Sequence, residues 1–243
     1  MGGDNLESDE TVSNSYHKAI GKGSIRQIFL DLDGPLLDGK ERHYHCYCRI
    51  LEKYGFKPIG IEEYWGLKRA LVNRRVLLNM SAAGEIYDRF LEAWLSMIES
   101  PELLALDKVQ KGAIDCLASW KELGMELILV TMRKSRQALE EQLKLTGLRA
   151  YLDSVLVCDH AEGGMGKATA VREFSRNQLN NARALWIGDT EADWEAARVL
   201  ECEVVLLSNG LRNEDYLLSL PGAVVKPSIL AMKDYLSVRA NVS

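Results

Sequence analysis

The stretch Ile28-Phe29-Leu30-Asp31-Leu32-Asp33-Gly34 joins a short apolar run to two aspartates and a glycine. Its apolar run predicts a buried strand that ends at Asp31. Because side chains alternate along an extended chain, Asp31 and Asp33 point to the same side. Two neighbouring carboxylates repel each other, and a hard cation such as Mg²⁺ relieves that repulsion through oxygen ligands. The stretch therefore predicts the first strand of a sheet with a cation-binding edge.

The chain beyond Asp107 alternates short apolar segments with amphipathic ones. Glycines at positions 124 and 147 follow two of the amphipathic segments, as is common after helix C-termini. This alternation predicts βαβ units and a parallel sheet that is covered on both faces. The predicted strands are 126–131, 154–158, 184–187 and 203–207, and the predicted helices are 109–123, 135–146, 167–178 and 190–200.

Residues 41–106 interrupt this alternation with sequence that is typical of helices. Tyr44, Cys48 and Leu51 recur at helical spacing, and a second apolar stripe runs through residues 85–98. Because the interruption occurs once, soon after the first strand, we interpret it as an inserted cap. The predicted fold class is α/β, a Rossmann-like parallel sheet core with an inserted α-helical cap. The predicted divisions are a flexible N-terminal tail (1–24), the core (25–40 and 107–243) and the cap (41–106).

Composition excludes several classes of partner. The 243-residue chain has a formal net charge of -5 and no basic block, which argues against nucleic acid. Its apolar runs are too short to span a bilayer, and the N-terminus lacks the apolar core of a signal peptide. Five cysteines without a CxxC pair indicate a reduced protein. We expect a cytoplasmic protein, a monomer or homodimer, without a membrane partner.

Polar residues also follow the other predicted strands, where an open parallel sheet binds its ligands. Asp189 adds a third carboxylate, and Asp193 lies one helical turn further on the same face. Thr131 offers a hydroxyl and Lys167 a positive charge to a phosphate dianion. Gly34 lets the backbone approach phosphate oxygens closely. The chain therefore predicts an oxygen-lined Mg²⁺ site beside a phosphate site.

The segments around Asp31, Thr131, Lys167 and Asp189 resemble, in this order along the chain, the motifs of the haloacid dehalogenase superfamily of phosphohydrolases, over roughly residues 25–210. The position of the cap resembles the phosphoglycolate-phosphatase-like branch. The resemblance implies a Mg²⁺-dependent phosphatase that hydrolyses a small phosphate monoester, a phosphorylated metabolite, through an aspartyl-phosphate. It implies that Asp31 is the nucleophile and that Asp33 is the general acid and then the base.

The same resemblance assigns the remaining residues of the motifs. Thr131 and Lys167 orient and neutralise the phosphoryl group. The implied Mg²⁺ ligands are Asp31, the backbone carbonyl of Asp33 and Asp189, with Asp193 in support.

Two alternatives stay open. A phosphomutase would use the same residues, and a non-catalytic member would only bind a phosphate or a metabolite. Pro35 stands where the family usually has threonine; it removes one backbone N–H and fixes φ, which favours the non-catalytic alternative. Most basic residues of the segment 68–75 are expected on a solvated face. The candidate substrate contacts are Gly34, Met132, Arg133 and Arg74.

Two further motifs are interpreted as structural. His43, His45, Cys46 and Cys48 invite a zinc site, but their spacing scatters them around a helix. Residues 163–167 resemble a phosphate loop, but alanines occupy positions 161 and 168, where its first glycine and its Ser or Thr belong.

Overall fold

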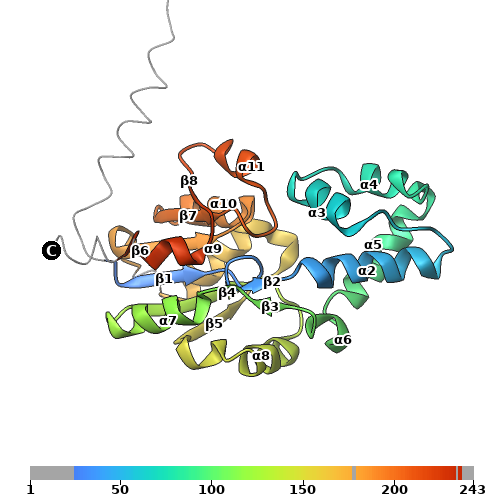
Figure 1. Cartoon of the computed structure of the whole chain (residues 1–243). Helices are drawn as coiled ribbons and strands as arrows, with labels where there is room; N and C mark the ends of the chain where they lie inside the picture. Colours follow the sequence, from blue (N-terminus) through green and yellow to red (C-terminus); the bar gives the residue numbers. More distant parts are fainter. Residues whose placement is uncertain (1–24, 177–178, 234, 237–243) are drawn as a thin grey trace, which may run out of the picture.

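A computed structural model describes residues 25–176, 179–233 and 235–236. The predicted tail, residues 1–24, lies outside them. Within the described residues, six parallel strands form one sheet in the order β5-β4-β1-β6-β7-β8 (Figure 1). The strands are β1 (Gln27–Leu30), β4 (Glu126–Thr131), β5 (Ser154–Val157), β6 (Ala184–Gly188), β7 (Glu203–Leu207) and β8 (Val224–Lys226).

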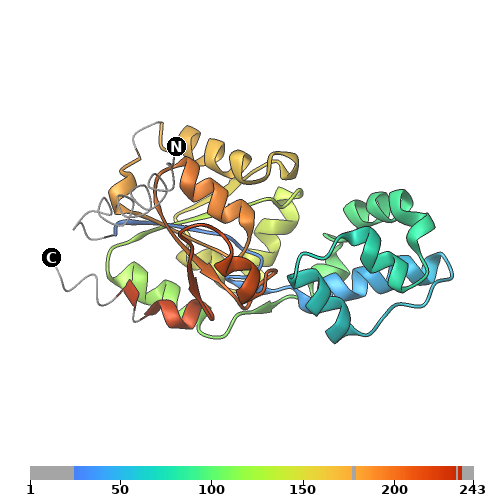
Figure 2. The same cartoon turned by 90° about the horizontal axis from the view of Figure 1, so that it is seen from above.

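Alternating side chains of β1 divide between two apolar layers. Ile28 and Leu30 pack with residues of α7 and α8, and Phe29 packs with residues of α9 and α10. Figure 2 shows α9 and α10 (yellow-orange to orange) on one side of the sheet and α7 (green) on the other. The predicted α/β core, covered on both faces, is therefore confirmed. The helices are α7 (Ala113–Glu122), α8 (Arg136–Leu145), α9 (Gly163–Phe174) and α10 (Glu191–Val199).

A helical segment leaves the core after β1 and returns before α7. Two short antiparallel strands, β2 (Leu37–Asp38) and β3 (Lys108–Val109), pair where the chain leaves and re-enters. The segment lies beside the sheet rather than on a face of it, and it encloses its own apolar cluster around Tyr47, Leu78 and Phe90 (Figures 1 and 2). We call it the cap; that it is a domain spanning 41–106 stays a prediction. Its helices are α2 (Lys40–Lys53), α3 (Ile61–Arg69), α4 (Arg74–Met80), η1 (Gly84–Ile86), α5 (Tyr87–Met97) and α6 (Pro101–Leu104).

Several predicted boundaries are wrong for local reasons. The helix predicted from 109 begins at Ala113, because Val109 pairs with Leu37 in β3. The helix predicted to start at Lys167 starts at Gly163 and ends at Phe174. Glycine disfavours helix, but a side chain at Gly164 would overlap the Ala192 carbonyl of α10, so close helix packing overrides propensity.

The end of the sheet was not predicted. Strand β8 and helix α11 (Glu214–Leu218) follow β7. No helix in the described part of the chain is long and apolar enough to cross a membrane.

Candidate functional site

Three neighbouring strands end at one edge of the sheet and present polar residues there. Asp31 follows β1, Thr131 ends β4 and Asp189 follows β6. Leu30 is in register with Leu129 of β4 and with Ile187 of β6, so Thr131 and Asp189 each lie one position beyond the residue that is level with Asp31. All three polar side chains are buried. The parallel sheet thus brings together residues that lie far apart in sequence.

Lys167 joins two of the carboxylates from within α9. Its Nζ lies 3.1 Å from Asp31 Oδ1 and 2.6 Å from Asp193 Oδ1, and its side chain is fully buried. Burial alone would lower the pKa of Lys167, but Asp193 and Asp31 outweigh it and raise the pKa. Lys167 is therefore a permanent cation at this edge.

Asp193 is saturated by hydrogen-bond donors. Its Oδ1 accepts from Lys167 Nζ and from Trp186 Nε1 at 3.2 Å. Its Oδ2 accepts from the amides of Asp189 and Thr190, both at 3.1 Å, and from Thr190 Oγ1 at 2.7 Å. Burial would raise the pKa of Asp193, but Lys167 and these hydrogen bonds lower it. Asp193 therefore organises the turn after β6 as an ionised carboxylate.

The two carboxylate oxygens of Asp189 differ in their hydrogen bonding. Oδ2 accepts from the Leu211 amide at 2.5 Å. Gly34, with φ +103°, and Gly210 flank the carboxylate so closely that a Cβ on either would overlap it. Oδ1 is buried and has no hydrogen-bond partner among the described residues. Burial, with Asp31 and Asp193 nearby, raises the pKa of Asp189 well above its usual value. A buried acceptor without a partner is costly, so this oxygen is available to a cation or a water molecule.

Oxygen atoms of Asp31, Asp189 and Asp193 lie within 4.8 Å of one another. Burial raises the pKa of Asp31 to about 7, and the attraction of Lys167 offsets only part of that effect. A divalent cation would satisfy Asp189 Oδ1 and would favour ionised Asp31. The donor set consists only of oxygens, so the site fits a hard cation. Because Asp193 is saturated, the two carboxylates left to hold the ion are Asp31 and Asp189.

Asp33 faces a different partner set from Asp31. Arg133 Nε donates to Asp33 Oδ2 and Nη2 to Oδ1, both at 2.8 Å, and Nη2 of Arg42 in α2 also donates to Oδ1. Asp107 holds both arginines, through Arg42 Nε at 2.8 Å and Arg133 Nη2 at 3.2 Å. Burial would raise the pKa of Asp33, but Arg133 and Arg42 lower it to about 2. Asp33 is thus held ionised in this arrangement.

Sequence reasoning did not select Arg42 and Asp107. Arg42 is almost completely buried, four residues before buried Cys46. A charged residue on the apolar stripe of a helix was the available signal. Asp107 carried no such signal, because its partner Arg42 is remote in sequence.

The other candidates lie in several places. Met132 packs against the apolar layer of α9 and α10. The Gly34 amide donates to the Leu37 carbonyl at 2.8 Å, so it is already engaged within its turn. Arg74 lies in the cap, over the Trp94 ring. The zinc alternative gains no support, because among the described residues only the three aspartates form a group able to hold a metal ion.

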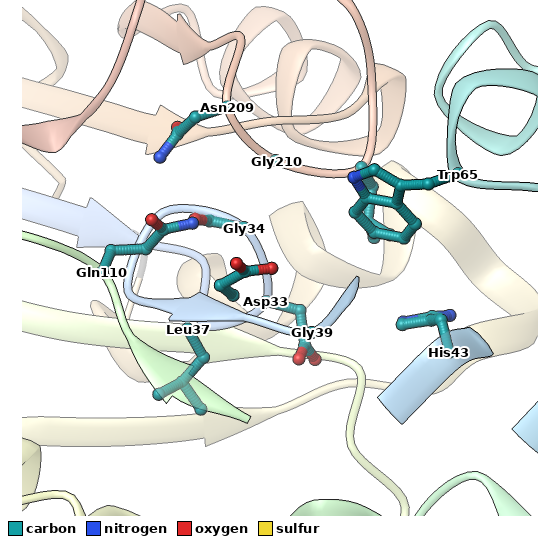
Figure 3. Close-up of a pocket in the computed structure, with 11 residues that line it drawn as sticks. Asp33, Gly34, Leu37, Gly39, His43, Trp65, Gln110, Asn209 and Gly210 are labelled. Carbon is teal, nitrogen blue, oxygen red and sulfur yellow. The ribbon is translucent and has the colours of Figure 1, made fainter. Parts of the chain in front are cut away.

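The cap and the core meet at Asp33. Figure 3 shows His43 and Trp65 of the cap, with Asp33, Gly34 and Gly210 of the core, around a small cavity. The volume of this cavity is about 10 Å³. That volume holds about one water molecule. The cap therefore lies tightly against the core beside the carboxylates.

The loop after β7 strengthens this contact. Arg69 of α3 donates to the carbonyls of Ser208 and, at 3.0 Å, Gly210. The Leu211 amide of the same loop donates a hydrogen bond to Asp189 Oδ2. The cap is thus tied to the loop that orients one carboxylate of the site.

Comparisons with known proteins show which chains this one resembles. A family model described as haloacid dehalogenase-like hydrolase matches residues 28–207. A phosphoglycolate phosphatase from Rhodobacter capsulatus is 24% identical over 76% of this chain and 85% of its own. One from Pseudomonas fluorescens is 25% identical over 76% of this chain and 70% of its own. A solved haloacid dehalogenase-like hydrolase from Streptococcus pneumoniae has a TM-score of 0.69 and 18% identity, covering 87% of this chain and 98% of its own, which shows a shared fold.

Proposed function

The chain belongs to the haloacid dehalogenase-like hydrolases, and we propose that it is a Mg²⁺-dependent phosphatase that hydrolyses a small phosphate monoester through an aspartyl-phosphate on Asp31. Two relatives carry the name phosphoglycolate phosphatase. Their names support phosphate-ester chemistry, and they make phosphoglycolate one substrate to test.

One observation carries the proposal. A fully buried lysine touches Asp31, while Asp189, beside it, has a buried oxygen that no other described residue contacts through a hydrogen bond. This arrangement provides a cation, a place for a second cation and a carboxylate between them. Transfer of a phosphoryl group needs such positive charge around its oxygens.

The chemistry of the chain follows in two steps. An oxygen of Asp31 attacks phosphorus, the bond from phosphorus to the ester oxygen breaks, and the leaving oxygen takes a proton from Asp33. Asp33 then takes a proton from water as that water attacks the phosphorus of the aspartyl-phosphate, which releases inorganic phosphate and restores Asp31. Lys167 neutralises the phosphoryl oxygens, and Thr131 donates a hydrogen bond to them.

Asp31 and Asp189, supported by Asp193, would hold the Mg²⁺ ion, and the backbone carbonyl of Asp33 stays a predicted ligand. When bound, the ion supplies charge neutralisation that lets a carboxylate approach an anionic phosphate. Asp193 keeps Asp189 in place through its bond to the Asp189 amide.

The cap controls entry and the state of Asp33. The cavity beside Asp33 is too small for a phosphate ester, so the cap must move for substrate to enter. Arg42 moves with the cap and, with Arg133, keeps Asp33 ionised. Ionised Asp33 suits the second step as a base; for the first step, these ion pairs must loosen so that Asp33 carries a proton.

Phosphate release from para-nitrophenyl phosphate tests the function. We expect release with Mg²⁺, none after chelation, and none from Asp31→Asn protein that keeps the wild-type melting temperature. Return of the phosphoryl group to the product without free phosphate would instead identify a mutase. Absence of turnover over a broad panel of monoesters, including phosphoglycolate, would contradict the proposal.

A further inference from the structure

A second, larger cavity lies within the cap. Its volume is about 350 Å³, within the range of pockets that hold small organic ligands. Helices α3, α4 and α5 supply most of its wall, and Arg212 of the core also lines it. The catalytic roles proposed above do not use this cavity. Its aromatic lining consists of Tyr64, Tyr87, Phe90 and Trp94.

Two basic side chains line this cavity without a carboxylate partner among the described residues. Neither Lys68 nor Arg74 forms an ion pair with any carboxylate of the described residues. Both lie over the same ring of Trp94, Lys68 at 5.2 Å and Arg74 at 5.4 Å from its centroid. Arg212 differs, because Glu191 binds its Nε at 2.7 Å and its Nη2 at 2.6 Å. Uncompensated charge in the cavity therefore comes from Lys68 and Arg74.

The environment of Lys68 favours the presence of an anion. Burial, together with Arg74, Arg212 and Arg42, lowers the pKa of Lys68 from its usual 10.5 to about 7. Clustered cations of this kind repel one another, and an anion among them removes the repulsion. The cavity thus combines anion-binding charge with flat apolar walls.

The cavity adjoins the reaction site. The ring of His43 lies 5.5 Å from that of Trp94, which lines the cap cavity, and 6.0 Å from that of Trp65, which lines the cavity at Asp33. Leu211 lines one cavity and Arg212 the other. Burial lowers the pKa of His43 most, and the charges of Lys68, which lines the cap cavity, and of Arg42, which contacts Asp33, lower it further. His43, Trp65 and Leu211 therefore lie between the two cavities, and the cap movement that admits substrate is also what lets a group bonded to a phosphoryl at Asp31 reach Lys68.

We propose that the cap cavity binds the leaving group of the substrate, and that this group carries a second anion, a carboxylate or a second phosphate, on a carbon body longer than two carbons. The proposal rests on the phosphatase function given above. Lys68 and Arg74 bind the anion, and the aromatic walls contact the carbon body. The size of the cavity favours such a substrate over phosphoglycolate, whose leaving group has two carbons.

Matched aryl phosphates test the charge requirement. The kcat/KM of para-carboxyphenyl phosphate is compared with that of para-carbamoylphenyl phosphate, which has a neutral group of the same shape. The bisphosphate of hydroquinone tests a second phosphate, and phosphoglycolate tests a short leaving group. We expect the anionic aryl esters to exceed the neutral one by about tenfold to a hundredfold, the usual value of a hydrogen bond to a charged group. The better of the two anionic esters identifies the anion, and phosphoglycolate falls below both.

Variants locate the effect in the cavity. Arg74→Met and Lys68→Met should each lower the preference for the anionic ester about tenfold, whereas Arg74→Lys, which keeps the charge, should retain part of it. Arg89→Met is the matched control, because Arg89 is an exposed cap arginine that lies over Tyr54, outside the cavity. Arg89→Met should keep the wild-type preference.

A binding measurement separates this inference from catalysis. The phenol product para-hydroxybenzoate should raise the melting temperature of wild-type protein more than para-hydroxybenzamide does, and Arg74→Met should abolish the difference. Wild-type protein that hydrolyses the neutral and anionic esters equally well, and binds both phenols alike, overturns the inference and leaves the phosphatase function standing. Failure to hydrolyse any monoester, with the binding preference intact, overturns the phosphatase function instead.

Discussion

Replacing Lys167 by methionine leaves two buried carboxylates without the lysine that lies between them. Lys167 and Asp193 are fully buried, and the Nζ to oxygen distances are 2.6 Å to Asp193 and 3.1 Å to Asp31. At an effective dielectric of about 20, each contact is worth about 5 to 6 kcal/mol before the cost of burying the charges. Loss of one member of a buried ion pair usually costs about 3 to 5 kcal/mol net. We expect Lys167→Met to lower the free energy of unfolding by that amount.

Urea unfolding followed by tryptophan fluorescence, in buffer with a chelator, measures this loss. For a chain of this size, the same loss corresponds to a fall in melting temperature of about 6 to 20 °C. We also expect phosphatase activity to fall by about a hundredfold or more, because a charge that stabilises the transition state is gone.

Lys121→Met is the matched control for this change. Its Nζ lies 2.6 Å from Asp153 Oδ1, but both side chains are 35% exposed. An exposed pair of this kind contributes only about 0 to 1 kcal/mol. If Lys167→Met loses no more stability than Lys121→Met, the reasoning about the buried cluster is wrong.

Three other results follow from the site and its surroundings. Mg²⁺ at about 100 times its Kd should stabilise wild-type protein by about 2.7 kcal/mol in a melting assay, and Asp189→Asn should abolish this; an unchanged response would place the ion elsewhere. Gly210→Ala should lower the free energy of unfolding by about 1 to 3 kcal/mol and abolish the stabilisation by Mg²⁺, because the added Cβ would overlap Asp189. Gly66→Ala is the control and should be tolerated, because a Cβ at Gly66 has nothing within 4 Å. Burial lowers the pKa of His43 well below 6.5, so its contribution to stability is complete above pH 6.5 and declines below it, at up to about 1.4 kcal/mol per pH unit. Because Asp31 and Asp189 have raised pKa values and oppose this decline equally in each protein, urea unfolding from pH 7.5 to 5.5 should show it as a loss of wild-type stability relative to His43→Gln. The exposed-site variant His45→Gln should follow the wild type, and parallel profiles for all three would exclude the contribution of His43.

The sequence predicted most strands and helices of the core, because apolar runs and helical spacing can be recognised in short segments. The apolar runs before Asp31 and through 126–131 predicted buried strands, and parallel order then placed their polar ends together. The start of α9 was missed, because a glycine-rich segment favours a loop in the sequence pattern. The segment is helical in the structure, where α10 packs closely against Gly164. Strand β8 was missed as well; it lies at the edge of the sheet and is only three residues long.

The site was predictable in its carboxylates and its lysine but not in its partners. Asp31 and Asp189 follow strand ends, which sequence can locate, and Lys167 lies near the start of the helix after β5. Arg42 meets Asp33 only when the cap folds back onto the core, and the Leu211 amide meets Asp189 only through a loop after β7. Such contacts depend on tertiary approach, which no local pattern encodes.

Covalent trapping at Asp31 tests the central claim most directly. Wild-type protein is mixed with Mg²⁺ and para-nitrophenyl phosphate, quenched in acid during turnover, reduced with borohydride and digested for peptide mass spectrometry. An aspartyl-phosphate at position 31 is reduced to homoserine, so the account predicts homoserine at Asp31 in the wild-type protein and no reduction product in a folded Asp31→Asn variant. Phosphate release by Asp31→Asn at the wild-type rate, or a phosphoryl group trapped on another residue, would contradict it.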